Sequence, residues 1–299
     1  MTIGFTEPKA GTVTGPALVS GGFGELSARA GASCLEELNI TDPKAVIDVH
    51  NRHLDAGADI LRTNTGGASP ERLDRYRMHD EAFIVSYMAA EHASKAARRH
   101  GQDRRVMGVA RVEALAPLIG FLPLGRVEAA TRTMASGLVG GGADLLLLET
   151  AQCPARIVAA MDGARRGMAD AGRTVPVLVK LRYETRLGAL ARGAIADGLA
   201  RAAAAVAGIG AQGLAIAPDN LDRPYAETLE AAATAYRAAL FVDLAPSSPH
   251  WAAVADLTGL RHRIAFTGGR RLEPSKTIEG PARPAPANDV GPIPVARSY

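Results

Sequence analysis

The chain has 299 residues, of which 47% are hydrophobic and only 4% aromatic, so a large core must be filled mainly by Ala, Val, Leu and Ile. Its formal net charge of +3 comes from basic residues scattered among acids, which argues against nucleic acid as a partner. The only cysteines, Cys34 and Cys153, support neither a disulfide framework nor a cysteine-rich metal site, and they fit a reducing, cytoplasmic location.

The first predicted strand ends in a glycine-rich turn. Residues 1–15 are a leader without apolar periodicity, and a strand is predicted over residues 16–24. It runs into the turn formed by Gly21, Gly22 and Phe23. Glycines at such a turn let a ligand approach bare backbone N–H groups, although a tight turn alone would also use them. The turn is therefore a candidate binding element.

Two later strands begin with the same tripeptide, Gly-Ala-Asp, at Gly57 and at Gly142. Polar side chains follow at the carboxyl ends of both strands: Arg62, Asn64 and Thr65 after the first, and Glu149 after the second. Each of these strands lies between two helical patterns. Asp42 and Pro43 open the helical pattern that precedes the first of the two strands, as N-cap and first-turn proline. This order indicates repeated βα units and a parallel sheet, in which ligands bind at the carboxyl ends of the strands.

The same alternation continues to residue 271. Further strands are predicted over residues 105–110, 175–182, 213–217, 239–243 and 263–267, with helices over 126–139, 154–171, 189–207, 225–238 and 251–257. We expect Arg156, Arg165 and Arg166 to lie on a solvated helix face. Eight strands predict an α/β fold, a (β/α)8 TIM barrel over residues 16–271.

The end of the chain predicts a contact surface. Residues 272–299 are rich in proline and have no apolar period, so the prediction lacks a regular eighth helix. One flank of the last strand would then be bare, and we expect a homo-oligomer or a partner protein to cover it together with the tail. No membrane partner is expected, because the weakly apolar stretch 199–218 contains Arg201 and Gln212.

Four segments carry a family resemblance: Gly21 to Phe23, residues 37–43, residues 57–72 and residues 144–150. Together they resemble the homocysteine S-methyltransferase family, which includes betaine-homocysteine methyltransferase and the N-terminal barrel of cobalamin-dependent methionine synthase. The resemblance spans residues 16–271 and implies that Glu149 binds the amino group of an amino-acid substrate. It also implies a zinc ion, held by three cysteines, that keeps the homocysteine sulfur as a thiolate.

The chain departs from the family at all three zinc ligands. Ile216 stands at the first cysteine position, and Arg270 and Arg271 stand at the other two. A guanidinium group cannot be deprotonated to replace a thiolate. Cys34 and Cys153 fall outside the motif positions. We therefore predict no zinc and no other cofactor.

Arginines gather at the predicted carboxyl ends of strands: Arg62, Arg111, Arg182, Arg270 and Arg271. Ser20 and Arg62 themselves stand where the family has acids. Arginine suits bidentate binding of carboxylate or phosphate, so these side chains form either an anion site or a set of solvated charges. Glu149 is correspondingly either a substrate-binding or acid–base group, or the ion-pair partner of a neighbouring arginine.

Two functions are compatible with this pattern. In the first, the barrel has lost zinc-dependent methyl transfer and binds a small anionic or amino-acid-like ligand, or serves as a subunit of an assembly. The alternative is a zinc-independent methyltransferase acting on a thiol or a related acceptor, with Glu149, Asn64 and Thr65 positioning the substrate. Titration with homocysteine, with and without zinc, distinguishes the inherited reaction from both.

Overall fold

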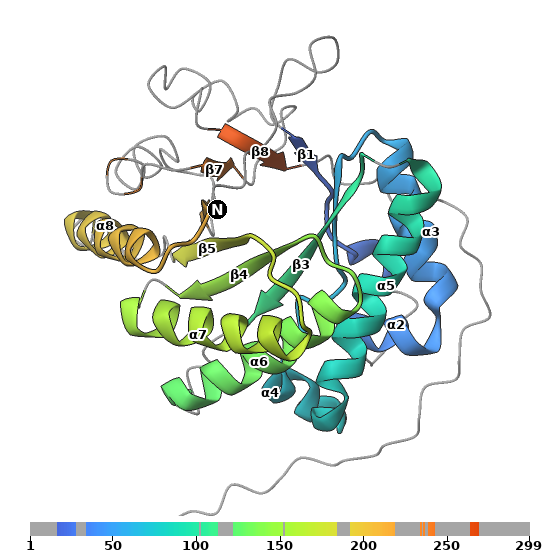
Figure 1. Cartoon of the computed structure of the whole chain (residues 1–299), viewed down its shortest axis with the longest axis horizontal. Coiled ribbons are helices and arrows are strands. Elements are labelled where there is room, and N and C mark those ends of the chain that lie inside the picture. The colour runs from blue at the N-terminus through green and yellow to red at the C-terminus, as the bar shows by residue number, and fades with distance from the viewer. Residues whose placement is uncertain are drawn as a thin grey trace, which may run out of the picture.

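The computed structural model describes residues 17–27, 34–101, 103–112, 122–151, 153–183, 192–218, 234, 236, 239–242 and 264–268. Within them, eight parallel strands close into a barrel in chain order, and the last strand pairs with the first (Figure 1). The strands are β1 Ala17–Val19, β2 Ile60–Arg62, β3 Arg105–Arg111, β4 Leu145–Ala151, β5 Val177–Tyr183, β6 Gly213–Pro218, β7 Ala239–Val242 and β8 Ile264–Gly268. The predicted TIM barrel is confirmed.

Helices surround the strands. They are α2 Leu38–Thr41, α3 Pro43–Asp55, α4 Pro70–Leu73, α5 Ala82–His100, α6 Leu124–Gly140, α7 Pro154–Asp170 and α8 Arg192–Gly208. Short 3-10 turns lie between them, at η1 Gly24–Leu26, η2 Leu35–Glu37, η3 Asp74–Tyr76 and η4 His79–Glu81. In Figure 1, α3, α5, α6, α7 and α8 follow one another around the barrel. As predicted, Asp42 is the N-cap residue of α3, and its Oδ1 accepts the N–H of Ala45 at 3.1 Å.

The repeated Gly-Ala-Asp tripeptide joins neighbouring strands. Gly57 and Gly142 adopt positive φ angles of 93° and 105°, which only glycine tolerates easily, and they turn the chain from helix to strand. Each following aspartate accepts a backbone N–H of the adjacent strand at 2.9 Å, Asp59 from Leu18 and Asp144 from Val106. The motif therefore has a structural role at the amino ends of the strands, opposite to the predicted site.

A third copy of this device, unnoticed in the sequence, precedes β6. Gly210 has a φ angle of 72°, and Gln212 takes the place of the aspartate. Its Oε1 accepts the N–H of Val177 at 2.7 Å, while its own N–H donates to the carbonyl of the same residue. The glutamine thus makes the same connection to the neighbouring strand without a charge.

Two apolar layers make up most of the described core, and a smaller cluster joins Phe23 and Leu26 to α2 and α3. Alternate strand residues fill the barrel interior, namely Val19, Ile60, Met107, Val109, Leu145, Leu147, Leu178, Ala215 and Phe241. The larger cluster, rich in Ala, Leu and Val, lies between the strands and the helices. Because side chains alternate along a strand, the next inward positions above the interior layer lie at the carboxyl ends, where ligands bind in this fold.

One surface prediction is wrong. Arg156, expected on a solvated face of α7, is buried, and its Nη2 donates to the carbonyl of Leu122 at 2.8 Å. The residue lies in the first turn of α7, where its long side chain reaches the segment just before α6. Arg165 and Arg166 behave as expected: both are exposed and pair with Asp162 and Glu128.

Some predictions fall on residues outside the described ranges. These are the leader, most of the helix over 225–238, the helix over 251–257, the missing eighth helix and the tail 272–299. None of the helices in the described ranges combines the length and the hydropathy that a membrane span requires.

Candidate functional site

A cluster of four charged side chains covers the apolar interior of the barrel at the carboxyl ends of its strands. The register aligns Arg111 of β3 with Glu149 of β4, and Glu149 with Lys180 of β5. Residues paired in register point to the same face of a sheet, and these three continue the inward rows of the interior layer. Arg62 continues the inward row of β2 above Ile60.

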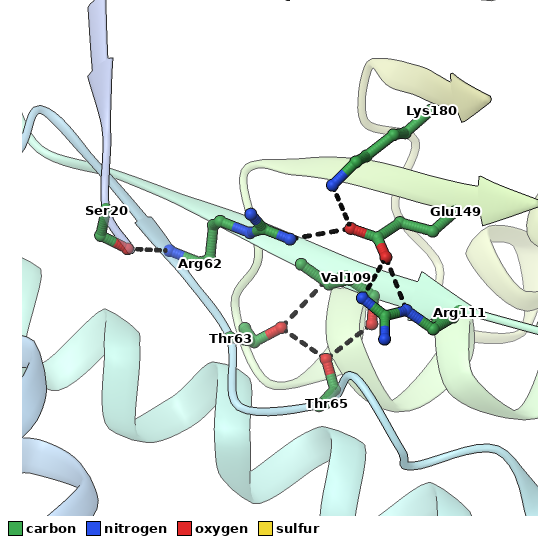
Figure 2. Close-up of polar contacts among 8 residues, drawn as sticks. All are labelled: Ser20, Arg62, Thr63, Thr65, Val109, Arg111, Glu149 and Lys180. Carbon is green, nitrogen blue, oxygen red and sulfur yellow. Dashed lines mark hydrogen bonds and ion pairs between the residues drawn. The ribbon is translucent and has the colours of Figure 1, made fainter. Parts of the chain in front are cut away.

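Glu149 lies at the centre of this cluster, between Arg62, Arg111 and Lys180 (Figure 2). Its Oε1 accepts from Arg62 Nη2 at 2.8 Å and from Lys180 Nζ at 3.1 Å. Its Oε2 accepts from Arg111 Nε at 2.6 Å. The side chain has no exposed surface, whereas those of Arg62 and Arg111 are 17% and 25% exposed. The three cations therefore separate the carboxylate from solvent.

The electrostatics of the cluster fix the protonation state of Glu149. Burial alone would raise its pKa, but the charges of Arg62, Lys180 and Arg111 outweigh burial and hold the pKa well below its usual range. Glu149 is therefore an anion at neutral pH, with both oxygens engaged. A carboxylate in this state is a poor proton acceptor and cannot reach a ligand without rearrangement.

The cluster forms part of the wall of a pocket of about 570 Å³, a volume typical of small-molecule sites. The described lining residues are Gly21, Gly22, Phe23, Cys34, Leu35, Glu36, Arg62, Thr63, Asn64, Gly66, Gly67, Arg72, Arg75, Tyr76, Val109, Arg111 and Lys180. The structure thus brings together most of the predicted site residues whose side chains it describes. Thr65 and Glu149 lie behind this lining. The Arg182 side chain, Arg270 and Arg271 fall outside what the structure describes.

Two threonines after β2 bind the chain to β3. The Val109 N–H donates to Thr63 Oγ1 at 2.9 Å, and Thr65 Oγ1 donates to the Val109 carbonyl at 2.6 Å. The two hydroxyl groups are also hydrogen-bonded to each other at 2.7 Å (Figure 2). Thr65 is fully buried, so its hydroxyl supports the backbone that carries Arg62 rather than facing the pocket.

Asn64 and Ser20 position other parts of the wall. Asn64 Nδ2 donates to the carbonyl of Leu35 at 2.7 Å and to Asn39 Oδ1 at 3.2 Å, which holds the η2 turn against the end of β2. The Ser20 hydroxyl accepts the backbone N–H of Arg62 at 2.9 Å. The predicted turn residue Phe23 contacts His50 edge to face, with ring centroids 5.2 Å apart.

Sequence reasoning missed several lining residues: Cys34, Glu36, Thr63, Gly66, Gly67, Arg72, Arg75, Tyr76 and Lys180. Lys180 gave a signal, since it lies near the end of a predicted strand, as the arginines do. Glu36 gave none, because the short η2 turn has no periodic pattern. Arg72 ends the segment 57–72 that carries part of the family resemblance, and Arg75 and Tyr76 follow it in the η3 turn.

The residues present do not fit the zinc site of the resemblance. Three thiolates are needed, and the chain has two cysteines. Cys34 is buried in the pocket wall, where burial raises its thiol pKa, while Cys153 is exposed before α7. Among the described residues, no group of three or more His, Cys, Asp or Glu side chains is placed to hold a metal ion.

Comparison with known proteins places this geometry in a family. Methionine synthases from Mycobacterium leprae and Mycobacterium tuberculosis are 34% and 33% identical over 155 residues, which are 51% of this chain and only 13% of each synthase. The metallated form of the homocysteine methyltransferase MmuM from Escherichia coli matches 88% of this chain and 94% of its own, with a TM-score of 0.66 and 18% identity.

A more distant solved structure shares the barrel alone. The carboxyl transferase domain of Rhizobium etli pyruvate carboxylase matches 85% of this chain and 39% of its own, with a TM-score of 0.51 and 14% identity. The family model for homocysteine S-methyltransferase, by contrast, matches residues 17–254, which include every described strand except β8. On this match, the chain belongs to the homocysteine S-methyltransferase family.

Proposed function

We propose that this chain binds a small anionic or amino-acid-like ligand at the mouth of its barrel and does not transfer a methyl group to zinc-bound homocysteine. The observation that carries the proposal is the cluster of Arg62, Arg111 and Lys180 around one buried carboxylate beside a pocket. Counted over the described residues, the cluster holds three cations and one anion.

The pocket wall strengthens this excess. Five of its described side chains are cationic, namely Arg62, Arg72, Arg75, Arg111 and Lys180, while Glu36 is the single acid among them. A concave, partly desolvated surface concentrates the field of such charges, and guanidinium groups bind carboxylate and phosphate oxygens well. A small organic anion is therefore the ligand class that the wall favours.

The inherited reaction lacks support at two points. Homocysteine would need a metal or a base to form its thiolate, and the described pocket lining contains no histidine and only the buried Cys34. Its amino group would need Glu149, which is already bound by three cations. The same lack of a thiol activator weighs against a zinc-independent methyltransferase.

Calorimetric titration tests the proposal. L-homocysteine, with and without added zinc, is compared with inorganic phosphate and with butanoate at low ionic strength. We expect no zinc-dependent binding of homocysteine, and we expect anion binding that weakens as salt is added. Zinc-dependent homocysteine binding, or no binding of either anion, would overturn the proposal.

Two variants locate the anion. Arg62→Gln removes a cation of the cluster, and Arg75→Gln removes one from the exposed rim of the pocket without touching Glu149. Each should weaken anion binding about tenfold or more. Arg132→Gln is the matched control, because it makes the same change of charge on the outer surface, where Arg132 pairs with Asp170. Equal effects of all three variants would show a general effect of charge and refute the site.

A further inference from the structure

Glu36 is a buried carboxylate that faces the pocket without a cationic partner among the described residues. It lies on the η2 turn, is 8% exposed, and forms part of the pocket wall. Its Oε1 accepts the backbone N–H of Gly67. No described Lys, Arg or His side chain forms an ion pair with it, unlike Glu149, which has three. Buried charges are normally paired, so a buried carboxylate in this position lacks the cation that would usually accompany it.

The surrounding chain holds Glu36 in place. A Cβ atom at Gly67 would lie 2.9 Å from Glu36 Oε1 and 3.0 Å from its Cδ, so only glycine lets the carboxylate approach the backbone so closely. Asn64 fixes the preceding residue of the turn through the carbonyl of Leu35. The carboxylate is therefore set in the wall by two neighbours, both from the segment after β2.

The anionic and cationic parts of the wall are close together. The position of a Cβ atom at Gly66 lies 3.9 Å from Arg111 Cζ and also 3.9 Å from Glu36 Oε1. The two charged groups are thus both neighbours of Gly66 and are separated by no more than twice that distance. One small molecule in the pocket can therefore contact both of them.

We propose that Glu36 is the cation-binding group of this pocket and that the ligand is dipolar, with an anionic end at Arg62 and Arg111 and an ammonium or similar group at Glu36. The inference rests on the anion site proposed above and narrows its ligand class. Glu36 takes the part that the family resemblance gives to Glu149, which is sealed by its own cations. The short separation limits the ligand to one with few bonds between its two charges.

A series of four-carbon acids tests this. Butanoate carries the anion alone, and 2-, 3- and 4-aminobutanoate add an ammonium group at increasing distance. In calorimetric titrations we expect at least one aminobutanoate to bind the wild-type protein roughly ten to one hundred times more tightly than butanoate. Glu36→Gln should abolish this preference. Glu37→Gln, on the same turn but outside the pocket lining, should preserve it.

The outcomes separate the two proposals. If butanoate binds and Arg62→Gln weakens it, but no ammonium group adds affinity, the dipolar ligand is refuted and the anion site stands. The same holds if the preference survives Glu36→Gln. If the wild-type protein binds neither butanoate nor inorganic phosphate, both proposals are overturned. Gly67→Ala is a second test of Glu36. The added methyl group should displace the Glu36 carboxylate without removing its charge, and the preference for aminobutanoate should fall.

Discussion

Replacing Glu149 with glutamine should destabilise the fold strongly. Glutamine keeps the shape of the side chain, but it removes a negative charge that contacts three cations and points an amide N–H₂ group at other donors. Removing one partner of a buried ion pair typically costs about 3–5 kcal/mol, because the remaining charges lose a counter-ion. Arg62 and Arg111 retain some contact with water, which favours the lower end, about 3 kcal/mol.

Urea denaturation followed by circular dichroism measures this loss. About 3 kcal/mol is a large share of the 5–15 kcal/mol by which domains are usually stable, so the midpoint should fall clearly while the slope of the transition is retained. Asp170→Asn is the control, since it removes a carboxylate from an exposed pair with Arg132. We expect little change there, because exposed ion pairs contribute little.

The pH dependence gives a second readout of the same charge. The pKa of Glu149 is lower in the folded protein than its ordinary value of 4.5, so its contribution to stability is complete above about pH 4.5 and is lost as the pH falls below that value. The glutamine variant should lack this part of the acid sensitivity. If Glu149→Gln cost no more than Asp170→Asn, the carboxylate would not be the centre of the cluster and would be available to a ligand.

Two further predictions concern the fold around the site. Burial, with the charges of His53 and His92, lowers the pKa of His50 to about 3. The protein should therefore lose stability as the pH falls from 6.5 towards 3, and His50 should account for a loss of about 2 kcal/mol at pH 5. His50→Leu should flatten that slope in urea titrations at stepped pH, whereas His79→Gln, at an exposed histidine, should not, and equal slopes would contradict the assignment. Gly163→Ala should destabilise by about 1–3 kcal/mol, because its Cβ would lie 2.3 Å from the Glu128 carbonyl oxygen where α7 meets α6. Gly125→Ala, which meets nothing within 4 Å, should be neutral or stabilising by up to about 1 kcal/mol, and similar losses in both variants would refute this account of the packing.

The sequence predicted the barrel and the location of its mouth well. Each strand is a compact apolar run bounded by glycine or by a helical pattern, and parallel strands necessarily bring their carboxyl ends to one edge. Arg62, Arg111 and Glu149 could therefore be expected near one another. The sequence left two alternatives for Glu149, a group that acts on a substrate and an ion-pair partner of a neighbouring arginine. The described contacts with Arg62 and Arg111 favour the ion-pair partner.

Other parts of the site depend on information that a single sequence does not contain. The contact of Lys180 with Glu149 follows from the register between β4 and β5, which a periodic pattern in either strand leaves open. Glu36 reaches the pocket only because an irregular turn folds back onto Gly67. Burial of Arg156 likewise depends on where Leu122, just before α6, lies, and not on the pattern of α7.

The family resemblance gives Glu149 a substrate-binding role, and the contacts of Glu149 in this chain favour a different one. The family resemblance places an acid where Arg62 stands, on the inward row of β2. A cation at that point faces Glu149 and adds to Arg111 and Lys180, so the carboxylate is bound by its neighbours before any substrate arrives. Under the proposed function, the ammonium end of homocysteine would find Glu149 already engaged. The residues at the three cysteine positions of the resemblance, Ile216, Arg270 and Arg271, bear on the sulfur end of the same molecule. The proposal of a pocket that selects a different small ligand accounts for both departures at once.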